Sequence, residues 1–549
     1  MAHAVTAFGD MEWSMPPQKM SLAMKTRFIT IAAFAAILTI LSAPQSPFAA
    51  DLYFHCSVSG DSVGDRFFHI ARGHGDVNGD GYEDVLIGAP YGGTSGYAKL
   101  YYGGAEFDTI PDLVFYGEEY AGIASHFGES CAFIGDINND DFDDILIGAP
   151  ATSISYYENG KAYLYLGSAE MDTVPDLTFI GEDWYHRLGE NVSGAGDVNN
   201  DGYDDWLISA PWDCWGYGRI YLYYGSADPD PICDIYFVAQ DFLRFKDAQL
   251  GDINGDGYDD LAFYKLDGGL DFLIIPQIHF GSPQMDTIPD LRWPDDLYFD
   301  YFAVSGVGDI NCDGYNDWAI GFYNDYKVYF GDADPDTTPD MVLTPEDPID
   351  RMAYAICGAD VNNDGVSDLL TNGIEEVGDH NYSYVLTYCG GENLDESYDY
   401  IFDVNEPDLA IGYTLGAADI YADSIVQILA GGFQDSYDSD PGQVWFLSVE
   451  PPLGMKPINP MMPPAYDLIV YPNPFNPTTT INYALPKACE VKLIVYDIQG
   501  CEIRTLVNQW QNPGIHEVTF NGSDLASGIY VYHIEAGEYE RVNKMVLLK

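Results

Sequence analysis

Short runs of alternating apolar and polar residues recur along most of the chain, and each run is bounded by Gly, Pro, Asn or Asp. Typical runs are AKLYYG from Ala98, AYLYLG from Ala162 and RIYLYYG from Arg219. An alternation with a period of two is typical of a half-buried β-strand, and no helical pattern separates these runs. The pattern therefore predicts an all-β fold.

The strands belong to a repeat that opens with an acidic loop and continues into a short apolar run, as in DVNGDGYEDVLIGAP. A second turn, Asp-Thr-x-Pro-Asp, follows later in the unit and leads into another strand. Each unit therefore carries four strands. Six clear copies and a degenerate seventh begin, at spacings of 51 to 61 residues, at Asp76, Asp136, Asp197, Asp252, Asp309, Asp360 and Asp419.

Seven units of four short strands predict a seven-bladed β-propeller over residues 51–450. The seventh unit supplies only three strands before the chain enters a proline-rich stretch. Asp51-Leu-Tyr-Phe54 resembles the opening of a fourth strand, such as Asp112-Leu-Val-Phe115. We expect this N-terminal strand to close blade seven, because pairing the two chain ends removes two exposed sheet edges.

Residues 1–50 predict an N-terminal extension and a secretory signal peptide. A basic start at Met24 precedes an apolar run over 28–41, which is too short to span a bilayer comfortably. Translation from Met1, Met20 or Met24 is compatible with this pattern. We expect the mature chain to be secreted and to have no transmembrane segment.

The C-terminal part of the chain follows a change in composition. Residues 451–465 (PPLGMKPINPMMPPA) form a proline-rich linker that cannot join a sheet interior. Residues 466–549 contain about seven short strands separated by turn signals, which suggests an immunoglobulin-like β-sandwich.

The charge is concentrated in the predicted propeller. Residues 51–450 hold 76 acidic and 12 basic side chains, a net charge of −64, whereas residues 466–549 hold 9 and 6, a net charge of −3. Such a field repels nucleic acid, so we expect no nucleic-acid partner. Divalent cations are the natural counter-charge.

The acidic loops follow the pattern Asp-x-Asn-x-Asp-Gly-x-x-Asp. Positions 1, 3, 5 and 9 offer side-chain oxygens and position 7 offers a backbone carbonyl, a set that suits calcium. Asp141 replaces the glycine of position 6 in the second loop, a tolerable change because Asp visits the left-handed region more readily than most residues. An EF-hand would need an acidic residue at position 12, where Ile87 stands in the first loop. The alternative is that the loops are only polar turns.

We predict six structural calcium sites, each within a β-hairpin. The seventh loop keeps Asp419 and Asp423 but has Tyr421, Ser424 and Gln427 at the other key positions, so it should bind weakly or not at all. The predicted ligands, in the order of positions 1, 3, 5, 7 and 9, are Asp76, Asn78, Asp80, Tyr82, Asp84; Asp136, Asn138, Asp140, Phe142, Asp144; Asp197, Asn199, Asp201, Tyr203, Asp205; Asp252, Asn254, Asp256, Tyr258, Asp260; Asp309, Asn311, Asp313, Tyr315, Asp317; and Asp360, Asn362, Asp364, Val366, Asp368.

Residues 51–450 resemble the FG-GAP repeats of the integrin α-subunit propeller, whose hairpin loops bind calcium. The resemblance rests on Phe127-Gly128 and on the Gly-Ala-Pro of 88–90 and 148–150, with Ser-Ala-Pro at 209–211. Blades four to seven lack both marks, so the resemblance is strongest over the first three blades.

The C-terminal domain looks like a type A sorting domain of the bacterial type IX secretion system. The matching segments are YPNPFNPT from Tyr471, LASGIY from Leu525 and the closing KMVLLK from Lys544. The resemblance implies a Gram-negative source, the type IX machinery as a partner, and a location outside the cell or on its outer surface.

Recognition is expected on the face opposite the acidic loops, where irregular aromatic-rich loops emerge between the second and third strands. The alternative, which so many aromatic residues favour, is that these side chains only pack the loops against the blade edges. The candidate ligand contacts are Tyr91, Tyr156, Tyr157, Trp212, Trp215 and Tyr217.

No catalytic spacing of Ser, His, Cys or phosphate-binding residues was found, so we expect no enzyme. The leading hypothesis is a calcium-binding surface or secreted module that binds an extracellular protein or glycan and acts in adhesion. One alternative is a secreted carbohydrate-active enzyme, which would need carboxylates facing each other across the central channel. The other is a passive structural surface protein.

Overall fold

The computed structural model describes most of residues 50–547. The positions that it does not describe are 1–49, 68–69, 106, 119–123, 154–157, 183, 212–217, 240–241, 246–247, 267–273, 294–302, 323–324, 345–348, 350, 378–379, 392–393, 404–408, 435–440, 450–466, 472–476, 486–488, 497–501, 512–513, 524, 538 and 548–549. The predicted signal peptide and the proline-rich linker lie outside the described residues.

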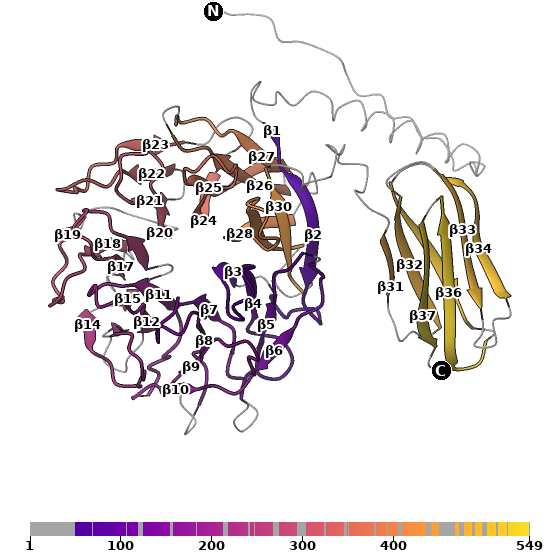
Figure 1. Ribbon diagram of the computed structural model, residues 1–549, viewed down its shortest axis with the longest axis horizontal. Helices are drawn as coiled ribbons and strands as arrows, with labels where there is room; N and C mark the ends of the chain where they lie inside the picture. Colours follow the sequence, from indigo (N-terminus) through magenta and orange to yellow (C-terminus); the bar gives the residue numbers. More distant parts are fainter. Residues whose placement is uncertain are drawn as a thin grey trace, which may run out of the picture. The chain divides into compact units, whose positions relative to one another are not determined.

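The described strands between Ala50 and Ser448 form seven sheets, which Figure 1 shows arranged radially around a central opening. Blade one holds β3 (Ile70–Gly75), β4 (Asp84–Ala89), β5 (Tyr97–Tyr101) and β6 (Leu113–Tyr116), and blade two holds β7 (Ser130–Phe133), β8 (Ile145–Ala149), β9 (Lys161–Tyr165) and β10 (Leu177–Ile180). Blade three holds β11 (Val192–Gly196), β12 (Asp205–Ala210), β13 (Gly218–Tyr223) and β14 (Ile235–Ala239).

The next four sheets keep the same antiparallel order, with an additional strand in two of them. Blade four holds β15 (Phe242–Arg244), β16 (Gln249–Gly251), β17 (Asp260–Leu266), β18 (Ile274–His279) and β19 (Leu291–Arg292). Blade five holds β20 (Ala303–Gly308), β21 (Asp317–Phe322), β22 (Asp325–Tyr329) and β23 (Met341–Leu343). Blade six holds β24 (Arg351–Ala359), β25 (Asp368–Val377), β26 (His380–Tyr388) and β27 (Tyr400–Asp403), and blade seven holds β28 (Leu409–Ala418), β29 (Gln427–Gln434) and β30 (Gln443–Ser448).

The N-terminal strand completes blade seven, as expected from the sequence. Strand β2 (Tyr53–Ser59) pairs antiparallel with β30 and gives this sheet its fourth strand. The expected strand was placed slightly too early, because Ala50–Asp51 (β1) pairs instead with β27 of blade six, in parallel. Leu52 adds a backbone bond, since its N–H donates to the carbonyl of Ile401 at 3.1 Å. The N-terminal segment therefore pairs with strands of two neighbouring blades, six and seven.

Aromatic side chains fill the space between successive blades. An aromatic residue in one fourth strand, or directly after it, meets a ring on the third strand of the next blade, with ring centroids 4.7 to 5.5 Å apart. Such pairs stabilise by about 0.5–1.5 kcal/mol each beyond the area they bury. The four pairs are Phe115 with Tyr165, Phe179 with Tyr223, Phe237 with His279, and Trp293 with Tyr329.

The C-terminal domain is a sandwich of two antiparallel sheets around one apolar core. One sheet holds β31 (Asp467–Tyr471), β32 (Thr478–Leu485) and β35 (Gly514–Asn521), and the other holds β33 (Cys489–Tyr496), β34 (Glu502–Gln511), β36 (Gly528–Ala536) and β37 (Tyr539–Leu547). Both sheets contribute buried residues such as Phe520 and Ile534. The sandwich is confirmed, and its kinship to immunoglobulin domains stays a prediction. Within the described residues, no helix has the length and apolar character needed to cross a membrane.

Candidate metal centres

The six complete acidic loops occupy equivalent places in blades one to six. Each loop joins the first strand of its blade to the second, as the loop from Asp76 joins β3 to β4. The Asp-Thr-x-Pro-Asp turns join the third strand to the fourth, as Asp108 to Asp112 joins β5 to β6. Because successive strands run antiparallel, these two turns emerge at the same end of the blade. The face that carries the acidic loops is called the loop face below.

The aspartate at position 1 organises the backbone of each loop. In the first loop, Asp76 Oδ1 accepts the N–H of Asp80 at 3.1 Å and Oδ2 accepts the N–H of Gly81 at 2.8 Å. The same two bonds recur in the other five loops. Position 6 is left-handed, with φ of 86° at Gly81 and 70° at Asp141, so the expectation for Asp141 is confirmed.

The aspartate at position 9 is fully buried in all six loops. In the third loop, Asp205 Oδ2 accepts the N–H of Val198 at 3.0 Å and Oδ1 accepts the N–H of Gly225 at 2.8 Å. No ion pair among the described residues supplies a basic partner for any of these carboxylates. The six residues are Asp84, Asp144, Asp205, Asp260, Asp317 and Asp368.

Burial dominates the electrostatics of position 9. Together with the other carboxylates of the same loop, it raises the pKa of Asp205 to about 8, although the two backbone N–H donors oppose this rise. Asp84, Asp144 and Asp260 behave alike, with the pKa raised to about 8, and the pKa of Asp317 is raised to about 7. A buried anion in a field of like charge is favoured by a nearby cation.

The asparagine at position 3 provides an independent indication. In the second and third loops, Oδ1 of Asn138 and Oδ1 of Asn199 are buried and accept no hydrogen bond from the described residues. An unpaired buried carbonyl oxygen is costly, and a hard cation would satisfy it. In the first loop Asn78 Oδ1 instead accepts the N–H of Asp80 at 2.9 Å.

The carboxylates of the loops are mostly turned toward backbone N–H groups. Within the described part of the chain, no three Asp, Glu, His or Cys side chains already form a group that could hold a metal ion. The loops therefore offer the donor types that calcium requires, with most carboxylates bonded to their own loop backbone.

The seventh loop satisfies the same backbone without a complete ligand set. Gln427 stands at position 9, and its Oε1 accepts the N–H of Ile420 at 3.1 Å, as the aspartates do elsewhere. Its Nε2 donates to the carbonyl of Ile425, the position 7 oxygen that a cation would bind in the other loops. The position 7 carbonyl of this loop therefore accepts a hydrogen bond from a side-chain amide.

Of the predicted ligand contacts on the opposite face, the structure describes Tyr91. Its side chain is 41% exposed, and the centroid of its ring lies 4.2 Å from the guanidinium carbon of Arg66 and 4.7 Å from the ring centroid of His126. Tyr91 therefore packs on its scaffold while presenting part of its surface to solvent. The other predicted contacts lie outside the described residues: Tyr156, Tyr157, Trp212, Trp215 and Tyr217.

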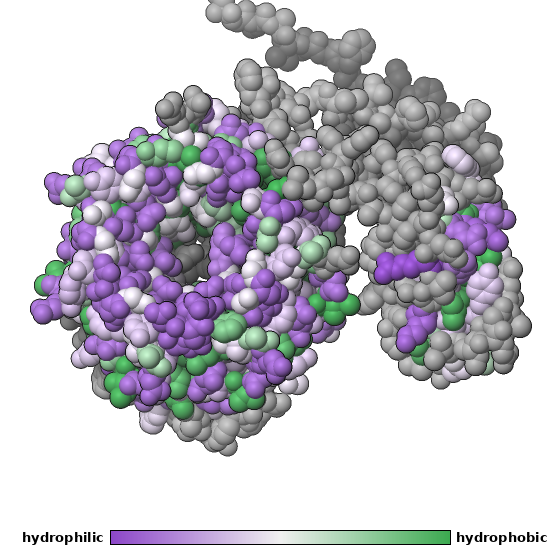
Figure 2. All heavy atoms as spheres, in the orientation of Figure 1, coloured by the Kyte–Doolittle hydropathy of each residue, from purple (hydrophilic) through white to green (hydrophobic). Residues whose placement is uncertain are grey.

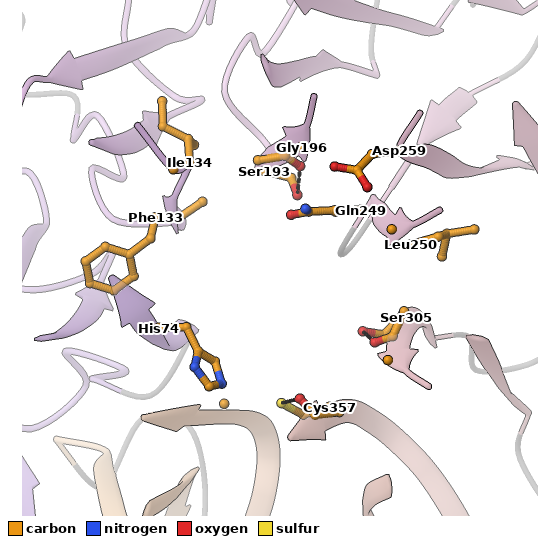
Figure 3. A pocket seen from close by; sticks show the side chains of 18 of the residues that line it. His74, Phe133, Ile134, Ser193, Gly196, Gln249, Leu250, Asp259, Ser305 and Cys357 are labelled. Atoms are coloured by element: carbon orange, nitrogen blue, oxygen red, sulfur yellow. Dashed lines mark hydrogen bonds between the residues drawn. The ribbon is translucent and has the colours of Figure 1, made fainter. Parts of the chain in front are cut away.

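The first strands of the blades line a central cavity of about 530 Å³ (Figure 3). Two serine hydroxyls in it donate to the carbonyl of the next residue, Ser193 Oγ to Gly194 and Ser305 Oγ to Gly306. Figure 2 shows that hydrophilic residues predominate on the face of the propeller that is turned to the viewer, around a central hollow. The carboxylates among the described lining residues are Asp204 and Asp259.

Sequence reasoning missed the residue at position 8 of each loop. In four blades it is an acid, and its side chain accepts the backbone N–H of position 1 in the preceding blade. The available signal was the recurrence of an acid directly before position 9 in four loops. This recurrence does not stand out in a chain that holds 87 acidic residues. The four residues are Glu83, Asp143, Asp204 and Asp259.

Seven sheets around a channel, six of them opened by an acidic hairpin loop, define a repeat-built β-propeller with a C-terminal sandwich. Residues 73–105 and 127–165 match the FG-GAP repeat, and residues 469–548 match the secretion system C-terminal sorting domain. The chain thus carries FG-GAP repeats and a type IX sorting domain, which marks it for export to the cell surface or the extracellular space.

Part of the chain is similar to integrin α chains. The chain is 27% identical to integrin alpha-5 of Xenopus laevis over 252 residues, which covers 43% of this chain and 23% of that protein. It is 31% identical to integrin alpha-PS2 of Drosophila melanogaster over 246 residues, which covers 43% of this chain and 16% of that protein. The chain therefore spans less than a quarter of the length of either relative.

A solved structure of PorZ, a surface component of the type IX secretion system of Porphyromonas gingivalis, was also matched. It has a TM-score of 0.36 and 14% identity, and covers 89% of this chain and 60% of that one.

Proposed function

We propose that the propeller binds six calcium ions in the loops of blades one to six. In each loop, the side chains at positions 1, 3, 5 and 9 and the carbonyl of position 7 would hold the ion. The observation that carries this proposal is the buried aspartate of position 9, which recurs six times without a basic partner among the described residues. The unpaired oxygens of Asn138 and Asn199 support it.

The role of these ions is structural. Each ion would neutralise carboxylates that otherwise repel one another. It would also fix the hairpin that joins the first strand of a blade, which lines the central cavity, to the second strand. A propeller stabilised in this way is a rigid scaffold for its opposite face, where loops such as the one bearing the half-exposed Tyr91 emerge.

We further propose that the exported protein is a non-enzymatic binding or adhesion module. Its ligand would be an extracellular protein or glycan, held by the face opposite the loop face. The sorting domain would engage the type IX machinery. The carbohydrate-active alternative is less well supported, because the channel carboxylates Asp204 and Asp259 belong to loop-face hairpins and each accepts a backbone N–H.

Removal of calcium is expected to lower the melting temperature of the purified protein strongly. At a calcium concentration about ten times the dissociation constant, each site adds about 1.4 kcal/mol, or about 8 kcal/mol for six sites. Thermal unfolding with calcium, with chelator and with magnesium measures this effect. Magnesium is the control, since it demands a tighter octahedral geometry. Identical unfolding curves in calcium and in chelator would contradict the proposal.

A further inference from the structure

Neighbouring loops are joined around the ring by the acids at position 8, which we call the latch carboxylates: Glu83, Asp143, Asp204 and Asp259. Each accepts the backbone N–H of position 1 in the loop of the preceding blade. The bonds run from Asp419 N to Glu83 Oε2 at 2.6 Å, from Asp76 N to Asp143 Oδ2 at 2.8 Å, from Asp136 N to Asp204 Oδ2 at 3.0 Å, and from Asp197 N to Asp259 Oδ2 at 3.0 Å.

Each latch residue also makes a second hydrogen bond in the opposite direction, from its own backbone N–H to the carbonyl of position 1. The N–H of Asp143 donates to the carbonyl of Asp76 at 3.2 Å, and the other three latch residues make the same return bond. Two of the latch carboxylates also lie directly against the backbone of a glycine. A Cβ on Gly135 would lie 2.1 Å from Asp204 Oδ2, and one on Gly196 would lie 1.9 Å from Asp259 Oδ2. The close approach of these two latches therefore requires glycine.

The latches of Asp143, Asp204 and Asp259 each touch two of the proposed calcium sites, whereas Glu83 joins site one to the seventh loop. Asp204 is the chain neighbour of Asp205, a ligand of site three, and it holds the backbone of Asp136, a ligand of site two. Asparagine side chains at position 4 add a second link, since Asn200 Nδ2 donates to the carbonyl of Gly257 in the next loop at 2.7 Å. Ordering of one loop thus fixes groups that belong to its neighbour.

The series of latches is incomplete. Position 8 is Asn316 in blade five, Ser367 in blade six and Val426 in blade seven. The N–H of Asn316 still donates to the carbonyl of Asp252 at 3.1 Å. The carboxylate half of the latch is therefore confined to the junctions from blade seven round to blade four.

We infer that the latch carboxylates couple adjacent calcium sites, so that sites one to four fill cooperatively while sites five and six fill independently. This inference rests on the proposed calcium binding. An ion in one loop orders position 9 and the latch beside it, which lowers the entropic cost of ordering position 1 in the preceding loop. The latch residues are positioning residues and not ligands.

The test is a calorimetric calcium titration of the full chain and of the Asp204→Asn variant. Asparagine occupies the equivalent position naturally at Asn316, so the substitution should be accommodated. The wild-type protein should take up six ions, with a Hill coefficient above 1 for the cooperative group. The variant should still take up six ions, with a Hill coefficient nearer to 1 and a midpoint at roughly fivefold higher calcium or more.

Two further variants sharpen the test. Asp172→Asn removes one charge from an Asp-Thr-x-Pro-Asp turn on the loop face. Among the described bonds, Asp172 Oδ1 accepts only the N–H of Val174. This variant should titrate like the wild type. Asn316→Asp adds the missing carboxylate and should bring a fifth ion into the cooperative group. This second variant keeps the test informative if Asp204→Asn folds poorly.

The outcomes separate the two proposals. Six ions bound by the wild type with a Hill coefficient of 1, or an Asp204→Asn titration that matches the wild type, would overturn the coupling and leave the calcium sites standing. Loss of ions from the variant at saturation would make Asp204 a ligand and would also overturn it. A wild-type protein that binds no calcium would refute the proposed function itself.

Discussion

Replacement of Asp205 by Ala is expected to destabilise the propeller by about 3–5 kcal/mol. The substitution removes the acceptor of two buried N–H groups, those of Val198 and Gly225, and each unsatisfied group costs about 1–3 kcal/mol. It also removes the proposed position 9 ligand of site three. Denaturant unfolding in calcium and in chelator measures both contributions, and the loss should be larger in calcium.

The matched control for this prediction is Asp172→Ala. Asp172 is also an aspartate on the loop face, but it is exposed and bonds only within its own turn in the described contacts. Its replacement should cost about 0.5 kcal/mol or less. If Asp205→Ala proved as mild as this control, position 9 would not support the loop in the way that we describe.

Deletion of residues 50–59 is expected to prevent folding of the propeller as a monomer. Strand β2 pairs with β30 over six residues, and it buries Val58 against the core of blade seven. Loss of two buried aliphatic side chains, Leu52 and Val58, together with the ladder bonds costs about 5–10 kcal/mol, which approaches the whole stability of a typical domain. Light scattering and circular dichroism would detect the aggregation and unfolding.

The control is a chain that begins at Ala50 and retains both β1 and β2. It should remain soluble and monomeric, whereas the chain that begins at Gly60 leaves the apolar edge of β30 open to self-association. A chain from Gly60 that unfolded at the same denaturant concentration as the control would show that ring closure does not depend on β2.

Much of the fold could be predicted because the same sequence pattern recurs at a regular spacing, which marks where each blade begins. The spacing of the acidic loops and the alternation within AKLYYG identified the strands, and the missing strand of the seventh unit pointed to the N-terminus. The parallel pairing of β1 with β27 could not be predicted. It involves two residues at each strand, too few for a periodic pattern, and it depends on where the chain passes between two blades.

The loops were also predictable in part. The residue types at positions 1, 3, 5 and 9 indicated oxygen donors, and the left-handed backbone at Asp141 followed from the position it occupies. The latch carboxylates were missed because their partners are backbone groups 62 to 68 residues away in the chain, or 336 residues away for Glu83, and such distant partners leave no trace in local composition. The amide of Gln427 was seen only as a lost ligand, whereas in the structure it bonds both ends of its loop.

The most direct test of this account is the number of calcium ions per chain, measured by elemental analysis after equilibration with calcium at a saturating concentration. We expect six ions, one for each loop that has an aspartate at position 9, with no seventh ion in the loop that contains Gln427. A protein that retained no calcium under these conditions would contradict the account, and the acidic loops would then be polar turns only.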